Sequence, residues 1–309
     1  MKATQTFVPL IAGLLITAAV FTACQKNSSD PSTGDTISAQ DQLTLQASAQ
    51  ADDAADNAYN DVFTNVMGVN DDAGIGTGIG VFFAKPRTGS TGAPVSSFGD
   101  GVDSASHCYT VTVSETNGGF PKTITIDFGT GCTGRDGHTR RGKITAVYTG
   151  KMREGGSTAT VSFDGYYIDT FKVEGTLKAE NKSTGSGLIF SVTVTNGKIS
   201  IPTGDYIEVN KTHTWTQTAG ADTPHNPADD VFNVTGSSAG TASLLGVTYQ
   251  WTTEITTPIV RKLSCRWRVA GQVTVTRNSK KAVIDYGNGE CDNKATVTIG
   301  QKVYDITLH

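Results

Sequence analysis

The sequence predicts a mainly β protein: one long antiparallel meander, as a sandwich or an open barrel-like sheet, preceded by a single amphipathic helix. Three observations favour this fold class. Apolar and polar residues alternate through most of the chain after Cys108, which is the period of a half-buried strand. Threonine, serine and glycine are abundant while only 17% of residues are charged, a balance typical of strands and turns. A cysteine-bracketed motif also occurs twice, at residues 108–132 and 265–291.

Residues 1–23 predict a lipoprotein signal peptide. Lys2 gives a short basic start, and residues 7–21 form an apolar stretch of about 15 residues without charge, which is short for a membrane span. Small residues then precede Cys24. This order is similar to a bacterial lipoprotein signal, in which the cysteine at the cleavage site is acylated and becomes the new N-terminus. An ordinary secretory signal peptide is the alternative.

The next three segments lead from the lipid to the sheet. Residues 24–37 are polar and lack periodicity, so they predict a flexible tether. Residues 38–68 predict one amphipathic helix, because Ser38 can cap the first amide groups and an apolar stripe recurs at helical spacing up to a final glycine. We expect this helix to pack on the sheet, with partner binding as the alternative. Residues 69–106 are rich in glycine and predict a flexible or edge β segment.

Residues 107–309 predict the β domain. Residues 171–180 alternate between apolar or glycine positions and charged or polar positions, so one face of this strand is buried and the other lies in water. Residues 190–194 and 247–253 repeat the pattern. Asn-Gly and Asp-Gly pairs punctuate these runs and predict two-residue hairpin turns. The pairs are Asn117-Gly118, Asp136-Gly137, Asp164-Gly165 and Asn196-Gly197.

The duplicated motif consists of a cysteine, a strand-like run, Ile-Asp-aromatic-Gly-x-Gly and a second cysteine. One copy extends from Cys108 to Cys132 and the other from Cys265 to Cys291. If Cys24 carries the lipid, four of the five cysteines remain, and the matched spacing favours a disulfide within each copy in an oxidising compartment. Three pairings are possible. The chain-entropy model assigns about 3–4 kcal/mol to each closed loop of this size.

Asp127 and Asp285 occupy the acidic position of the two copies. A short acid before a glycine turn accepts backbone N–H bonds and fixes that turn, which is the role that we expect. A paired-carboxylate site, as in glycosidases, would require the two motifs to lie within about 10 Å of each other. Oxygen-rich turns at 130–136, 222–230 and 288–293 leave calcium as an alternative, although none has the register of a known calcium loop.

The sequence predicts no catalytic residue, cofactor or metal site. The five histidines lack the i, i+4 spacing of a helical zinc motif. Beyond residue 23 there are 24 basic and 29 acidic side chains with no basic stripe, so we expect no nucleic-acid partner. Trp215, Trp251 and Trp267 lie on predicted strands, and we expect them in the core, with stacking on a sugar or an apolar ligand as the alternative.

The lipoprotein-type N-terminus, the predicted helix and the two copies of the duplicated motif together resemble a family of Bacteroidota envelope lipoproteins. The resemblance rests on Ile-Asp-Phe-Gly-x-Gly-Cys and Ile-Asp-Tyr-Gly-x-Gly-x-Cys-Asp-Asn-Lys-Ala, and it is strongest at residues 108–150 and 255–309. It implies acylation of Cys24, for example by palmitate, and an outer-membrane location on the periplasmic or the surface face. Gln25 stands where the inner-membrane retention signal of some Gram-negative bacteria has aspartate. The resemblance implies no activity.

Three functions are compatible with these features. The first is a lipid-anchored, non-catalytic binding or structural module of the envelope, whose ligand could be a glycan, a lipid or a protein. The second is a carrier that holds a lipid or another apolar ligand in a groove of the sheet. The third is a glycan-active hydrolase with two carboxylates in a cleft. The duplicated motif, the expected disulfides and the lack of catalytic motifs favour the first.

Overall fold

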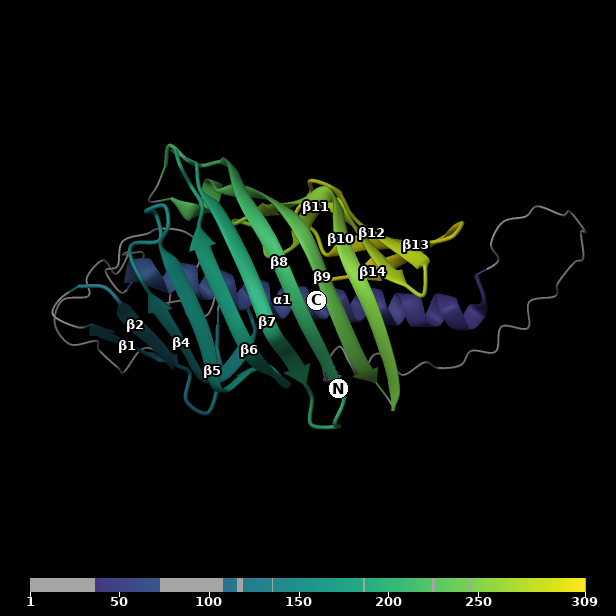
Figure 1. Ribbon diagram of the computed structural model, residues 1–309, viewed down its shortest axis with the longest axis horizontal. Coiled ribbons are helices and arrows are strands. Elements are labelled where there is room, and N and C mark those ends of the chain that lie inside the picture. The colour runs from purple at the N-terminus through teal and green to yellow at the C-terminus, as the bar shows by residue number, and fades with distance from the viewer. Residues whose placement is uncertain are drawn as a thin grey trace, which may run out of the picture.

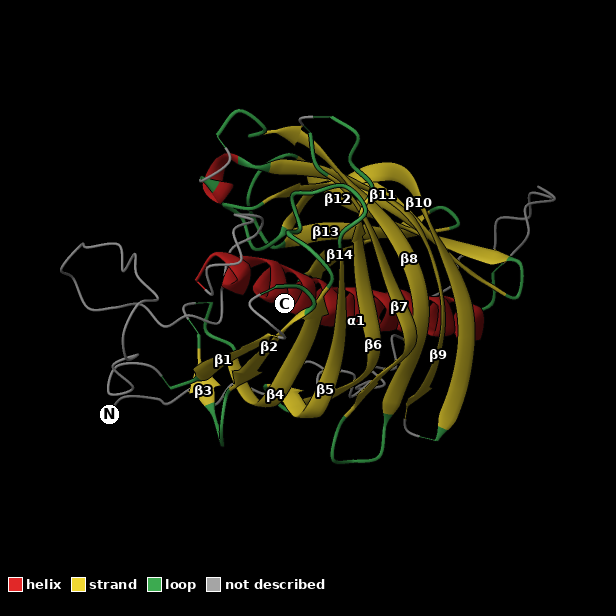
Figure 2. Cartoon of the chain, turned by 60° about the vertical axis from the view of Figure 1, so that its left-hand side comes forward, coloured by secondary structure: helices red, strands yellow, loops and turns green. Residues whose placement is uncertain are grey.

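A single long helix lies along the concave side of one curved antiparallel sheet (Figures 1 and 2). The computed structural model describes residues 37–72, 108–115, 119–134, 136–185, 187–223, 226–244 and 246–308. The predicted signal peptide with Cys24, nearly all of the predicted tether, and most of the glycine-rich segment lie outside the described residues. The predicted mainly β fold with one N-terminal helix is confirmed, and the sheet is open.

Helix α1 spans Ala39–Asp72. It begins after Ser38, whose Oγ accepts a hydrogen bond from the Asp41 amide at 3.1 Å and so satisfies one of the free amides of the first turn. The helix does not stop at Gly68 as the sequence predicts. Val66, Met67 and Val69 are buried beside that glycine, and this packing outweighs the low helix propensity of a single glycine.

The sheet has fourteen strands, and all but one follow the order of the sequence. Each strand pairs antiparallel with its neighbour along the chain, whereas β3 lies off this path and pairs with β4. Among the described strands, β1 and β14 form the two edges. The strands are β1 Thr110–Glu115, β2 Lys122–Asp127, β3 Cys132–Thr133, β4 Thr139–Tyr148, β5 Thr158–Ile168, β6 Phe171–Asn181, β7 Ile189–Ser200, β8 Tyr206–Ala219, β9 Val231–Leu244, β10 Val247–Lys262, β11 Arg268–Arg277, β12 Lys280–Asn288, β13 Lys294–Ile299 and β14 Lys302–Thr307.

The core lies between α1 and the concave face of the sheet. The Phe63 ring of the helix contacts Trp215 with ring centroids 5.0 Å apart. Hydroxyl groups tie the helix to the sheet in both directions: Tyr59 donates to the Glu174 carbonyl at 2.6 Å, and Tyr148 donates to the Val66 carbonyl at 3.0 Å. The helix is therefore enclosed by the sheet along most of its length and contributes to the main core.

Both predicted cysteine pairs lie at disulfide distance. The sulfurs of Cys108 and Cys132 are 2.03 Å apart, and those of Cys265 and Cys291 are 2.02 Å apart. The first pair brackets the β1–β2 hairpin, and the second brackets the β11–β12 hairpin. The duplicated motif thus places one cross-linked hairpin near each end of the sheet.

Two of the predicted hairpin turns are wrong. Asp164-Gly165 lies inside β5 and Asn196-Gly197 lies inside β7, where the pairing register shifts. Gly165 and Asn196 have positive φ angles, 55° and 51°. A strand bulge uses this left-handed conformation as readily as a turn does, so the local sequence did not distinguish the two. Asp136-Gly137 does lie in the turn before β4, and Asn117-Gly118 is outside the described residues.

A continuous series of bulges curves the sheet around α1. Each of the eight neighbouring pairs from β4–β5 to β11–β12 has a register shift. A bulge bends its strand and increases the local twist. At Gly142, with φ +77°, a Cβ atom would lie 2.0 Å from the Gly165 carbonyl oxygen of the adjacent strand. Glycine is required there because two backbones approach too closely for any side chain.

This close approach can be tested with Gly142→Ala. We expect the free energy of unfolding to fall by about 3 kcal/mol or more, since the new methyl group forces β4 away from β5. Gly156→Ala is the matched control, because Gly156 also has a positive φ, 87°, but nothing lies within 4 Å of the added Cβ. Its expected cost is only about 1–2 kcal/mol, from backbone strain alone. Equal losses in urea denaturation of the two variants would contradict the proposed packing.

Candidate functional site

Acidic side chains of α1 face the sheet and form the main concentration of buried charge in the described residues. Asp56 stands at the centre. Its Oδ1 lies 2.6 Å from Lys211 Nζ of β8, and its Oδ2 lies 2.5 Å from Arg268 Nη2 of β11. Burial alone would raise the pKa of Asp56, but Lys211 and Arg268 hold it well below its ordinary value. Asp56 is therefore a buried, ionised carboxylate held by two cations.

Arg268 joins a second helix carboxylate to the same cluster. Its Nη1 also contacts Asp53 and donates to the Tyr286 hydroxyl at 2.8 Å. Tyr286 in turn donates to Asp53 Oδ1 at 2.9 Å. Tyr286 follows Asp285 in the second copy of the duplicated motif, so this copy contributes directly to the polar interior.

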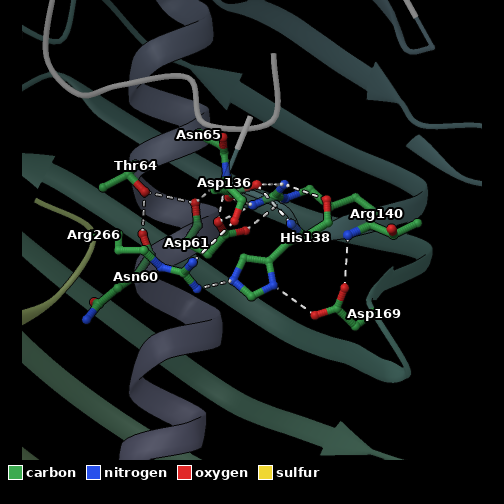
Figure 3. Close-up of polar contacts among 10 residues, drawn as sticks. Asn60, Asp61, Thr64, Asn65, Asp136, His138, Arg140, Asp169 and Arg266 are labelled. Carbon is green, nitrogen blue, oxygen red and sulfur yellow. Dashed lines mark hydrogen bonds and ion pairs between the residues drawn. The ribbon is translucent and has the colours of Figure 1, made fainter. Parts of the chain in front are cut away.

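Arg140 forms a separate pairing near the other end of the helix. The guanidinium is fully buried, and its Nη2 lies 2.5 Å from Asp61 of the helix and 2.6 Å from Asp136 of the preceding turn. Burial alone would lower the pKa of Arg140, but the two carboxylates raise it well above its ordinary value. Arg140 thus bridges α1 and the turn before β4 (Figure 3).

A small cavity lies beside the Asp56 cluster. Asp52 accepts hydrogen bonds there from Ser238 Oγ at 2.7 Å and Trp251 Nε1 at 3.0 Å, and burial raises its pKa. The cavity has a volume of about 20 Å³ and is also lined by His213 and Arg261, among other residues. That volume suits about one water molecule and is far below that of sites for small organic ligands.

These buried pairs restrict how the helix can sit in the sheet. Removing two charges from water costs about as much as their attraction returns, so a buried pair adds little net stability over an apolar contact. Removing one partner is costly, however, because the other charge is left alone in the interior. A rotation of α1, or a shift along its axis, would likewise leave Asp53, Asp56 and Asp61 in the interior without their cations. The arrangement therefore fixes the register of the helix.

A second polar cluster lies at the surface (Figure 3). His138 Nδ1 lies 2.8 Å from Asp169 Oδ2, and Arg266 Nη2 lies 3.2 Å from His138 Nε2. Arg266 Nη1 also donates to the Asp136 carbonyl at 3.3 Å. Because Arg266 can only donate, His138 accepts at Nε2 and donates from Nδ1 to Asp169. The cluster joins the β10–β11 connection to the start of β4, two parts of the sheet that are distant along its strand order.

The surface cluster contains a histidine and a carboxylate, as a catalytic dyad does, but it differs from a dyad at the second nitrogen of the imidazole. In such a dyad the second imidazole nitrogen faces a hydroxyl or thiol nucleophile. Here Arg266 bonds that nitrogen. The geometry favours a structural role, in which these side chains link the β10–β11 connection to the start of β4, over nucleophilic chemistry.

The two acids of the duplicated motif lie in equivalent local settings. Asp127 Oδ1 accepts from the Gly129 amide at 2.8 Å, and Asp285 Oδ1 accepts from the Gly287 amide at 2.9 Å. These are the bonds of an Asx turn. The Gly129 amide and Lys143 also lower the pKa of Asp127. The hydrogen bond is the same in both copies, but Asp127 ends β2 and holds the turn that follows it, whereas Asp285 lies within β12, where the register with β11 shifts.

The remaining candidates of the sequence fall into the core or outside the described residues. Trp215 and Trp251 are buried in the core, and Trp267 packs half-buried against it. His213 shares the buried face of β8 with Trp215, and burial lowers its pKa to about 4. Three histidines lie outside the described residues, namely His107, His225 and His309.

Sequence reasoning missed the buried charges, although the chain carried a signal for them. Lys211 and His213 occupy the same alternating positions of β8 as Ile207, Val209 and Trp215, so the period of two places both on the concave face. A cation at such a position needs a buried carboxylate as partner. The aspartates of the helix were the available partners.

No group of three or more histidine, cysteine, aspartate or glutamate side chains in the described part of the chain is arranged to hold a metal ion. The described residues also include no helix with the length and hydropathy of a membrane span. Comparisons of the chain with protein-family models, with curated proteins and with solved structures found no match.

Arg268→Met tests the role of the buried pairs. The variant leaves Asp53 without its cation and Asp56 with only Lys211, so we expect the free energy of unfolding to fall by about 3–5 kcal/mol. Lys198→Met is the control, since the exposed Lys198–Glu208 pair contributes at most about 0.5 kcal/mol. Chemical denaturation at neutral pH measures both. A loss below about 1 kcal/mol in the Arg268 variant would mean that the helix tolerates unpaired acids.

His213 gives the protein a specific pH dependence. Its pKa is about 4 in the fold and 6.5 when exposed, so between these values the unfolded chain binds a proton that the folded chain does not. Stability should therefore fall as the pH drops from about 6.5 to 4, by up to about 3 kcal/mol. His213→Gln should flatten this slope in urea titrations at several pH values. An unchanged slope in the His213 variant would refute the assignment.

Proposed function

We propose that the protein is a lipid-anchored, non-catalytic binding or structural module of the bacterial envelope. The main support is that α1 occupies the concave side of the sheet and is held there by buried ion pairs. The interior thus serves as a core, and the face left for contacts is the outer surface with its turns. The protein presents this surface from a rigid, cross-linked scaffold.

The envelope location is supported by the N-terminus and by the cysteines. The apolar stretch followed by Cys24 is similar to a lipoprotein signal. The other four cysteines lie in two pairs at disulfide distance, and such bonds persist in the periplasm and at the cell surface. We propose acylation of Cys24 and an outer-membrane location in a member of the Bacteroidota, on the basis of the resemblance carried by the duplicated motif.

The two other functions receive less support. A carrier needs an apolar groove, and here the helix side chains fill the concave side while the cavity beside Asp56 measures only about 20 Å³. A glycan hydrolase needs two carboxylates about 5–10 Å apart in a cleft that admits a sugar. Asp127 and Asp285 each accept a hydrogen bond from the amide two residues on, and the helix acids are buried in ion pairs. These observations favour the module.

Metabolic labelling with an alkyne analogue of palmitate tests the anchor. The wild-type protein should incorporate the label and fractionate with membranes, because the acyl chain partitions into the bilayer. Cys24→Ser should lose both properties. The double variant Cys108→Ser with Cys132→Ser is the control and should retain the label. Labelling of the Cys24 variant, or its absence from the wild-type protein, would overturn the proposed anchor.

Protease shaving of intact cells then locates the folded part. Peptides from exposed loops should be released and detected by mass spectrometry if the module faces outward. Their release only after the outer membrane is opened would assign the periplasmic face.

A further inference from the structure

The start of α1 lies beside several turns of the sheet, and together they form what we call the helix-start rim: residues 41–44, 247–249, 277–281 and 300–304 (Figure 1). Arg277 Nη1 donates to Thr44 Oγ1 at 3.0 Å, and Lys302 Nζ donates to Gln42 Oε1 at 3.3 Å. The Tyr249 ring lies 5.8 Å from the Arg277 guanidinium. The last strands of the chain therefore surround the first turns of the helix.

The helix-start rim carries the most exposed apolar side chains of the described residues. Five large apolar side chains are exposed in that part of the chain, and the three most exposed lie on this rim. They are Leu43 at 45%, Val247 at 49% and Val303 at 63%. The other two, Val113 and Val147, are both exposed at 38% and lie on β1 and β4. Exposed apolar side chains thus concentrate at one end of the molecule.

Positive charge on the rim is not neutralised as it is elsewhere on the sheet. Six surface lysines between β2 and β8 lie within 4 Å of a carboxylate, namely Lys122, Lys143, Lys172, Lys178, Lys182 and Lys198. On the rim, Arg277, Lys281 and Lys302 form no ion pair with a described residue. The nearby acids are Asp41, which accepts from the Ser38 hydroxyl, and Asp305 on β14. The rim therefore has a net positive charge.

The rim is also the part of the fold that follows the proposed lipid most closely in sequence. Residues 25–38 separate Cys24 from the helix, and a chain of fourteen residues can span at most about 50 Å. Apolar side chains among cations are the combination that binds an anionic bilayer surface, through burial in the headgroup region and through charge. The length of the tether, the exposed apolar side chains and the net positive charge all indicate an anionic membrane surface as the partner of the rim.

We propose that the helix-start rim docks on the anionic headgroup surface of the membrane that holds the lipid anchor. In this orientation α1, which is about 50 Å long, directs its far end and the surface cluster around His138 away from the bilayer. The inference rests on the proposed function for the anchor. It adds a defined membrane-facing surface and hence a defined orientation.

Single labelled cysteines in the full mature protein test the orientation. The native cysteines leave no free thiol when Cys24 is acylated and the other four are paired. A polarity-sensitive fluorophore is attached to Val303→Cys or to Val247→Cys, with Thr184→Cys in the β6–β7 connection as the control. On vesicles that contain phosphatidylglycerol, emission should shift to the blue at the two rim positions and stay unchanged at Thr184. Vesicles of phosphatidylcholine alone should give a smaller shift.

Charge variants of the labelled protein test the mechanism. Lys281→Gln combined with Lys302→Gln should lower the ratio of docked to undocked protein about 25-fold, about fivefold for each cation. The matched control is Lys172→Gln with Lys198→Gln on the outer face of the sheet, which removes the same charge and should leave the shift intact. Thermal melting of both variants checks that the fold is unchanged.

The outcomes separate docking from anchoring. If mass spectrometry finds acylated Cys24 but the rim labels behave like the Thr184 label, the anchor stands and the docking inference is overturned. If Cys24 is not acylated, the proposed anchor fails. Titration of the rim and Thr184 variants, remade with Cys24→Ser so that the introduced cysteine alone takes the label, with phosphatidylglycerol vesicles then decides docking by the presence or absence of the rim-specific shift. Blue-shifted emission of the label at Val303→Cys before vesicles are added would indicate contact with a second copy of the chain. This result would also overturn the docking inference.

Discussion

The structure depends on pairing the buried acids of one helix with cations of the surrounding sheet. Asp56 needs both Lys211 and Arg268, and Asp61 needs Arg140, because an ionised carboxylate in the interior is tolerated only with partners. These pairs fix how the helix is rotated and where it lies along its axis. The curvature of the sheet follows from the same requirement, since strands as distant in order as β4 and β11 must both reach the helix.

Local sequence patterns were sufficient for the fold class and for most of the architecture. The period of two identified the strands and their buried faces, and the capping residue Ser38 marked the start of the helix. Local patterns failed at Asp164-Gly165 and Asn196-Gly197, because a left-handed residue suits a bulge inside a strand as well as a turn between strands. Charge partners such as Asp53 and Arg268 are 215 residues apart, and only the tertiary structure brings them together.

The duplicated motif now has a structural interpretation in both copies. Each copy brackets a hairpin with a cysteine pair at disulfide distance, and the second strand of each hairpin carries an acid that accepts a hydrogen bond from the amide two residues on. One copy lies near the first edge of the sheet and the other lies near the last. An open sheet has exposed edges that can pair with other chains, and cross-links near both ends limit how far those edges can separate from the body.

The position of the helix at the beginning of the chain has a consequence for folding. Its partners are distributed over nearly all of the sequence that follows: Tyr59 bonds Glu174, Asp52 bonds Trp251, and Gln42 bonds Tyr304. Of the described elements, α1 is therefore synthesised before every strand that it contacts, up to β14. Such non-local topologies fold slowly and as a whole, because the entropy of closing long loops must be overcome before the contacts form. Until β4, β8 and β11 are in place, the helix acids would lack their cations, so folding of α1 is coupled to the synthesis of these later strands.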